Sequence, residues 1–168
     1  MNFPLNEGAA APVSVVIDGV EGFRQLLGRT LGPSRAMEIT QERIETFCRA
    51  VDNFEWTHWD EARCQQSRFG TTIAPAAFIQ AIFPYQWHSL AELRGFKSAV
   101  IAGSDRFRLL TPLRKGSVLH LLATVAAIED RGKDAAVFLD LQWEIPGGGP
   151  AAVARYVLRL TTAGISAD

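Results

Sequence analysis

Three β-rich runs near the end of the chain constrain its fold more than any other feature. They are "VLHLLATVAAIE" (118–129), "DAAVFLDLQWEI" (134–145) and "AAVARYVLRLTT" (151–162). The connections between them, "DRGK" and "PGGGP", are short and carry turn-forming residues, so consecutive runs can pair antiparallel. "PGGGP" lacks the lysine and hydroxyl residue of a phosphate-binding loop and joins two strands, so we interpret it as a hairpin connection. The sequence therefore predicts an antiparallel meander.

The segment before these strands predicts one long buried helix. "AAFIQAIFPYQWHSLAEL" (76–93) is apolar on nearly every side up to Pro84, as expected of a helix enclosed by other elements. Pro75 fits the first turn, and Pro84 should kink or end the buried part. Residues 97–117 predict two further strands. We therefore expect an α+β domain in which an antiparallel sheet of five or six strands wraps a central helix.

Shorter elements come earlier in the chain. Residues 36–51 predict a helix with Thr40 as N-cap, and residues 59–67 predict a second, short one. Residues 21–34 predict a short amphipathic segment that ends at Gly32-Pro33. With 168 residues the chain suits a single domain. We expect a loose N-terminal arm at residues 1–20 and one domain at residues 21–168.

Composition and charge exclude several classes of protein. The formal net charge is -1 and no basic run occurs, so nothing in the sequence favours nucleic acid or an anionic membrane surface as a partner. No apolar run approaches the roughly 20 residues of a membrane-spanning helix. Cys48 and Cys64 are the only cysteines and have no partners at metal-ligand spacing. We therefore expect a cytoplasmic protein without a bound metal or redox cofactor.

The stretch "AVDNFEWTHWDEA" (50–62) has the residues best suited to proton transfer. It places Asp52, Asn53 and His58 within seven positions, among large aromatic side chains. A histidine can take up or release a proton near neutral pH, whereas an asparagine can only donate and accept hydrogen bonds. His58 could instead be a hydrogen-bonded corner residue paired with Asp60, and Asn53 a helix C-cap.

The order of the elements and three local motifs resemble the MaoC-like hot-dog proteins. This family includes the (R)-specific enoyl-CoA hydratases and the nodulation-protein-N-like acyl dehydratases. The motifs are "LLGRTLGPSRAMEITQERIETFCRAV" (26–51), "NFEWTHWDEARCQQSRFGTTIA" (53–74) and "AGSDRFRLLTPLRKGS" (102–117). The resemblance covers about residues 26–125 and implies a single hot-dog domain.

The resemblance also implies an activity, the reversible addition of water to a trans-2-enoyl thioester. In the family an Asp and a His hold the water and move its protons, while a backbone N–H at the start of the buried helix binds the thioester carbonyl. Such an amide can stabilise the developing enolate oxygen. The implied substrate is an acyl group on CoA or on an acyl carrier protein, and no cofactor is implied.

This sequence departs from the family pattern at the catalytic acid. Aligned on the W-x-H-x-D pattern, the family's Asp falls on Asn53, and Asp52 takes a position usually held by a small residue. The family's His-Gly after "IA" is Pro75-Ala76 here, and a supporting hydroxyl residue is Ala81. We expect His58, Asn53 and Asp52 to be the catalytic candidates. The resemblance also implies a set of substrate-binding residues: Trp56, Phe69, Gly70, Ile73, Pro75 and Ala76.

The sequence leaves three functions open. The first is a MaoC-like hydratase or dehydratase in which Asn53 or Asp52 positions the water. The second is a repurposed enzyme for isomerisation, cyclisation or conjugate addition, in which His58 moves the proton while Asn53 and the Ala76 N–H steady an enolate. Trp56, Trp59 and Trp87 are expected in the core, with a pocket for a bulky or cyclic acyl group as the alternative. The third is a non-catalytic acyl-binding or partner subunit. Because a single sheet leaves one edge uncovered, we expect a homodimer.

Overall fold

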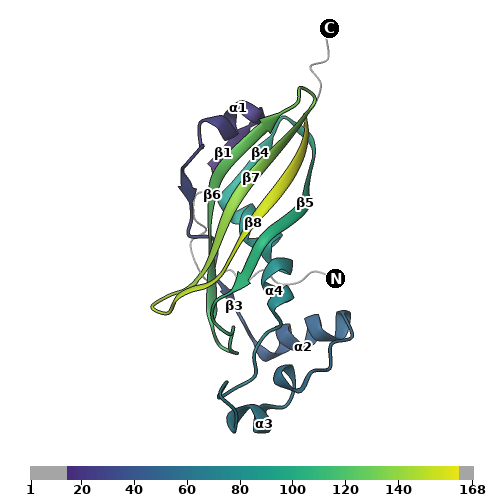
Figure 1. The fold of residues 1–168 in the computed structure, drawn as a ribbon, viewed down its shortest axis with the longest axis vertical. Helices are drawn as coiled ribbons and strands as arrows, with labels where there is room; N and C mark the ends of the chain where they lie inside the picture. Colours follow the sequence, from purple (N-terminus) through teal and green to yellow (C-terminus); the bar gives the residue numbers. More distant parts are fainter. Residues whose placement is uncertain (1–14, 163–168) are drawn as a thin grey trace.

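The computed structural model describes residues 15–162, and its main element is one antiparallel sheet (Figure 1). Its long strands are β5 (Phe96–Leu109), β6 (Val118–Asp130), β7 (Asp134–Ile145) and β8 (Gly149–Thr162). The short strands β2 (Thr30–Leu31) and β3 (Met37–Glu38) both pair with β6, which gives a sheet of six strands. Five of them follow the order β2-β6-β7-β8-β5, and β3 lies off this path, beside β6. The predicted meander and the predicted strand number are confirmed.

The central helical segment consists of two helices in tandem, α4 (Ala76–Ala81) and α5 (Phe83–Leu90). Ile82 separates them, and Pro84 lies in the first turn of α5, where its missing N–H costs no helical hydrogen bond. The helix therefore continues past Pro84, and the predicted interruption falls two residues earlier. Both helices bury apolar side chains in the same core as the inward faces of β6, β7 and β8.

The end of the predicted helix is wrong. Residues 91–94 form strand β4 (Ala91–Arg94), which pairs parallel with β1 (Val15–Asp18). Local sequence could not reveal this pairing, because the two partners are more than 70 positions apart. Residues 15–20 belong to β1 and to α1 (Gly19–Arg24), with Ile17 and Val20 buried. Of the arm predicted for residues 1–20, residues 1–14 lie outside the described residues.

The prediction of two strands in residues 97–117 is also wrong. One strand, β5, pairs with β8 over its whole length, and three register shifts interrupt the ladder. At the third shift Arg106 has a positive φ of 56°, and Phe107 beside it packs against the core. β5 has one more residue than β8 at each shift, and these residues are absorbed as β-bulges, which bend a strand without ending it.

The elements that hold the predicted site lie together at one end of the sheet (Figure 1). They are α2 (Gln41–Ala50), the 3₁₀ turn η1 (Trp56–His58) and α3 (Glu61–Gln65). The Thr40 hydroxyl accepts the N–H of Arg43 and caps α2, as predicted, and Asp60 caps α3 in the same way. The loop from Gln66 to Pro75 then leads directly into α4.

Candidate active site

His58 is buried, with only 7% of its surface exposed, and one ring nitrogen is held by the backbone. Its Nδ1 lies 2.7 Å from the carbonyl oxygen of Ile73, three residues before α4 begins. The amide of Ile73 in turn donates to the carbonyl of Thr57 at 3.0 Å. Two hydrogen bonds thus join the histidine segment to the segment that enters the central helix.

The Ile73 carbonyl determines which nitrogen of His58 carries the hydrogen. A carbonyl oxygen only accepts hydrogen bonds, so Nδ1 must be the protonated nitrogen. In the neutral ring, Nε2 is then left with a free lone pair. This arrangement is suited to a group that takes a proton at Nε2 while its orientation stays fixed at Nδ1.

Asn53 and Asp52 have different environments at the end of α2. The Asn53 amide N–H donates to the Cys48 carbonyl at 2.9 Å, and its side-chain oxygen accepts the N–H of Glu55 at 3.2 Å. The Trp59 indole donates to the Asn53 carbonyl at 2.9 Å. Asn53 is therefore half-buried and fixed, with its Nδ2 hydrogens left as donors.

Asp52 is exposed and has a positive φ of 51°. This left-handed conformation is common just after a helix, and aspartate tolerates it better than most residues. In the family, a small residue usually stands at the position of Asp52. The left-handed backbone at this position favours small or short polar side chains.

The six residues predicted to bind substrate occupy two short segments around His58. Trp56 is half-buried in η1, two residues before His58, and the guanidinium of Arg63 lies 4.1 Å from its ring centroid. The other five residues, Phe69, Gly70, Ile73, Pro75 and Ala76, lie in the loop and at the start of α4. Ala76 is the first helical residue and only partly buried, so its N–H has no partner within the helix.

Two arginines contact Phe69 and have no carboxylate partner within the described residues. The Nε of Arg114 donates to the Phe69 carbonyl at 2.7 Å, and the Arg68 guanidinium lies 5.0 Å from the Phe69 ring centroid. Arg114 also pairs with Ile73 across an isolated antiparallel bridge. Two guanidinium groups therefore border the loop that leads from α3 to α4.

A polar network that the sequence analysis did not identify supports the same segment. Lys115 lies 2.8 Å from Glu61 Oε2 and, together with hydrogen bonds from Thr71 and Thr72, lowers the pKa of Glu61 to about 2. The Thr72 hydroxyl also contacts the side chain of Gln41 at 2.5 Å. Thr72 and Gln41 carry no motif by themselves, because their role depends on segments that are far apart in sequence.

The other two histidines, the two cysteines and Trp87 have the contacts of structural residues rather than of catalytic ones. His88 is exposed on α5, and the Nδ1 of His120 lies 2.9 Å from the Ser34 carbonyl. Cys48 and Cys64 are free and buried, and burial raises the pKa of both thiols. Trp87 packs on Phe83 in the core, 5.9 Å between ring centroids, which agrees with the expected core role and not with the pocket alternative for this residue.

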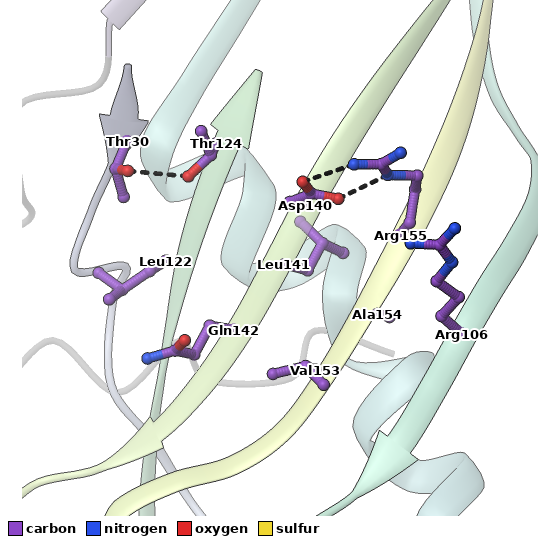
Figure 2. Close-up of a pocket in the computed structure, with 10 residues that line it drawn as sticks. All are labelled: Thr30, Arg106, Leu122, Thr124, Asp140, Leu141, Gln142, Val153, Ala154 and Arg155. Carbon is purple, nitrogen blue, oxygen red and sulfur yellow. Dashed lines mark hydrogen bonds and ion pairs between the residues drawn. The ribbon is translucent and has the colours of Figure 1, made fainter. Parts of the chain in front are cut away.

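Two surface hollows lie away from His58. One, of about 380 Å³, is on the sheet face between β6, β7 and β8 (Figure 2). There Arg155 is paired with Asp140 at 2.6 Å, and Thr30 bonds Thr124. The other, of about 510 Å³, is near the end of α5 and the start of β5. Neither is lined by a predicted site residue.

Two kinds of feature are absent from residues 15–162. No helix in this range is long and apolar enough to cross a membrane. Within the same range, no three His, Cys, Asp or Glu side chains gather closely enough to hold a metal ion.

Comparison with known proteins gives the family. Residues 25–147 match the family model described as FAS1-like, dehydratase domain region. The 3-hydroxyacyl-thioester dehydratase Z of Mycobacterium tuberculosis is 30% identical over 144 residues, which cover 84% of this chain and 95% of that protein.

Solved structures share the hot-dog fold. R-hydratase PhaJ1 from Pseudomonas aeruginosa has a TM-score of 0.69 at 14% identity, covering 84% of this chain and 86% of that one. The HadBC (3R-hydroxyacyl-ACP dehydratase) complex of M. tuberculosis contains a chain with a TM-score of 0.66 at 17% identity, covering 80% of this chain and 96% of that one. The predicted α+β hot-dog fold is confirmed. The chain belongs to the FAS1-like dehydratase family of MaoC-like hot-dog proteins.

Proposed function

We propose that this protein is a hydro-lyase that interconverts 3-hydroxyacyl and trans-2-enoyl thioesters. The observation that carries the proposal is the bond from His58 Nδ1 to the carbonyl of Ile73, three residues before α4, which leaves the Nε2 of the neutral ring as the proton acceptor. The dehydratase named among the relatives acts on a 3-hydroxyacyl thioester, which supports the same reaction for this chain.

In the direction of dehydration, His58 Nε2 takes the proton from the α-carbon, and the electron pair of that C–H bond moves toward the thioester carbonyl. The resulting enolate expels the 3-hydroxyl group, which receives the same proton from His58 and leaves as water. The C=C bond forms between the α and β carbons. One imidazole is enough for this sequence, because it gains and loses a single proton.

Asn53 and Ala76 assist without exchanging protons. The Asn53 Nδ2 hydrogens can hold the oxygen of the 3-hydroxyl group or of water, since its Oδ1 already accepts the Glu55 amide. The Ala76 N–H can donate to the enolate oxygen and stabilise its charge. Asp52 is the weaker candidate for this chemistry because it is exposed at the helix end.

The substrate that we propose is carried on a phosphopantetheine arm, either in CoA or on an acyl carrier protein. Arg68 and Arg114 support this because both border Phe69 and neither has a carboxylate partner in the described part of the chain. Guanidinium groups bind phosphate through short, charge-assisted hydrogen bonds. A fully extended phosphopantetheine arm has about 13 bonds from its sulfur to its phosphorus. Its phosphate can therefore lie up to about 15 Å from the thioester sulfur.

We further propose a homodimer in which two β5 strands meet. β5 ends the sheet order and is exposed along almost its whole length. Several of the apolar side chains on and just after it are exposed, including Val100 at 55% and Leu110 at 52%. A long, apolar sheet edge normally pairs or is covered.

The free thiols of Cys48 and Cys64 support a reducing, cytoplasmic location.

The amide at position 53 also supports a second candidate function. Without the family's carboxylate, His58 alone could move a proton along a carbon chain, as in isomerisation, cyclisation or conjugate addition. The third candidate, a non-catalytic partner subunit, is supported by HadBC, whose name describes a complex.

One experiment separates the three candidates. The protein, His58→Ala and Asn53→Asp are each incubated with crotonyl-CoA while the enoyl-thioester absorbance is followed. Turnover that is lost in His58→Ala supports the hydro-lyase. An inactive protein that gains hydration through Asn53→Asp supports the repurposed enzyme. Thioester binding without turnover in all three proteins supports the partner subunit.

A further inference from the structure

The side chain of Gln41 lies at the junction of three segments around His58. Gln41 is the first residue of α2, and its Nε2 donates to the backbone carbonyl of His58 at 3.0 Å and to Glu45 Oε1 at 3.1 Å. Its Oε1 lies 2.5 Å from the Thr72 hydroxyl, which donates to it. Both amide hydrogens and the amide oxygen are therefore engaged, which fixes the orientation of the amide group.

Thr72 links Gln41 to the segment that carries the histidine's anchor. It is fully buried, and it precedes Ile73, whose carbonyl holds the His58 ring. The Thr72 carbonyl accepts the amide of Lys115 at 2.9 Å. The Gln41–Thr72 contact thus adds a second link between the His58 backbone and the Ile73 segment, beside the direct bond from the Ile73 amide to the Thr57 carbonyl.

Glu61 and Lys115 complete the network from the solvent side. Glu61 Oε2 lies 3.3 Å from the Thr72 hydroxyl and 3.4 Å from its amide, and Lys115 neutralises the carboxylate at 2.8 Å. Because the hydroxyl has one hydrogen and the Gln41 oxygen is the nearer acceptor, Glu61 mainly receives the Thr72 amide and the Thr71 hydroxyl. The bond from the Thr72 amide to this carboxylate therefore holds the Thr72 backbone, while the Thr72 hydroxyl is left to Gln41.

From these contacts we propose that Gln41 and Thr72 are positioning residues for His58. They hold the ring so that Nδ1 donates to Ile73 and Nε2 faces the reacting carbon. This inference rests on the proposed hydro-lyase function, but the geometry that it describes can be measured without turnover. Neither residue touches the substrate in this scheme, and both act through the histidine. Displacement of a catalytic group by about 1 Å can lower a rate about a hundredfold.

The test compares four variants. Thr72→Val keeps the volume of the side chain and removes only the hydroxyl, while Thr72→Ser keeps the hydroxyl. Gln41→Glu keeps the length of the side chain but replaces both donors to His58 and Glu45 with an anionic oxygen. Thr71→Val is the matched control. The Thr71 hydroxyl, like that of Thr72, contacts Glu61, but it makes no contact with Gln41.

Two measurements are made on each variant. Nitrogen-15 NMR of the His58 imidazole reports whether Nδ1 alone carries the hydrogen in the neutral ring. Steady-state kinetics with crotonyl-CoA gives kcat and KM separately. We expect Thr72→Val and Gln41→Glu to mix the two tautomers and lower kcat about ten- to a hundredfold, with KM nearly unchanged. Thr72→Ser and Thr71→Val should resemble the unmodified protein in both measurements.

An unchanged tautomer in both Thr72→Val and Gln41→Glu would overturn the inference, as would an equal loss of kcat in Thr71→Val. If the unmodified protein does not turn over crotonyl-CoA, the hydro-lyase proposal fails, and the NMR comparison still decides whether Gln41 and Thr72 orient the ring. Thermal unfolding of each variant separates a general loss of folding from a local loss of orientation.

Discussion

Replacement of His58 by asparagine and by alanine should separate its structural role from its proposed chemical role. The Nδ2 of an asparagine stands at the same distance from Cβ as the histidine Nδ1, so His58→Asn can still donate to the Ile73 carbonyl. It has no counterpart of Nε2. His58→Ala removes both nitrogens and leaves the buried Ile73 carbonyl without this donor.

The structure gives a different magnitude for each effect. An unsatisfied buried acceptor costs about 1–3 kcal/mol, so His58→Ala should lower the free energy of unfolding by at least that amount. His58→Asn should lose less than about 1 kcal/mol, since the hydrogen bond is retained. Loss of a general acid–base group lowers the rate about 10²–10⁴-fold, which is about 3–5 kcal/mol of transition-state stabilisation. Both variants should show that loss.

Urea unfolding and crotonyl-CoA hydration, measured on the same preparations, check these expectations. The reasoning about Nε2 is refuted if His58→Asn keeps more than about a tenth of the activity of the unmodified protein. The reasoning about Nδ1 is refuted if the two variants are equally destabilised. Circular dichroism before each assay establishes that both variants are folded.

Four other predictions concern the surroundings of His58 and the sheet edge. Asn53→Asp should raise the hydration rate about a hundredfold, because a carboxylate can exchange a proton where an amide cannot. An unchanged rate would contradict the placement of side chain 53 beside the reacting oxygen. The double variant Arg68→Ala/Arg114→Ala should raise KM for crotonyl-CoA about tenfold. It should leave KM unchanged for crotonyl-pantetheine, which lacks the phosphate, and Arg29→Ala is the control. Equal effects of the double variant on both substrates would contradict a phosphate contact. The pKa of Glu61 is lowered from 4.5 to about 2, so its ionised form stabilises the fold above pH 4.5, and this contribution fades as the pH falls toward 2. The difference in Tm between the unmodified protein and Glu61→Gln should therefore be largest near neutral pH and shrink below pH 4.5, and a constant difference would refute the Lys115 pairing. Val100→Lys should convert the proposed homodimer to a monomer in analytical ultracentrifugation, whereas Arg159→Lys, a nearby exposed position on β8, should not.

Local sequence alone determined most of the fold. The long β-rich runs with turn residues between them specified β6, β7 and β8, because a tight connection leaves antiparallel pairing as the only arrangement. The capping residues Thr40 and Asp60 marked the starts of α2 and α3, since each satisfies a free amide in its own first turn. The resemblance to the family rested on the same local motifs and predicted the candidate site at residues 52–76.

Contacts between distant segments decided the rest. Residues 91–94 became a strand because β1 lies beside them, and β5 remained one strand because β8 pairs with it through its bulges. His58 Nδ1 is bonded to a carbonyl 15 positions further along the chain, and the His58 carbonyl accepts a hydrogen bond from Gln41, 17 positions before it. Hydrogen bonds of this kind leave no periodic pattern in the sequence, because they depend on where the folded backbone brings two segments together. Sequence thus determined which residues were candidates for the proposed chemistry, and only the tertiary structure decided which nitrogen of His58 carries the hydrogen.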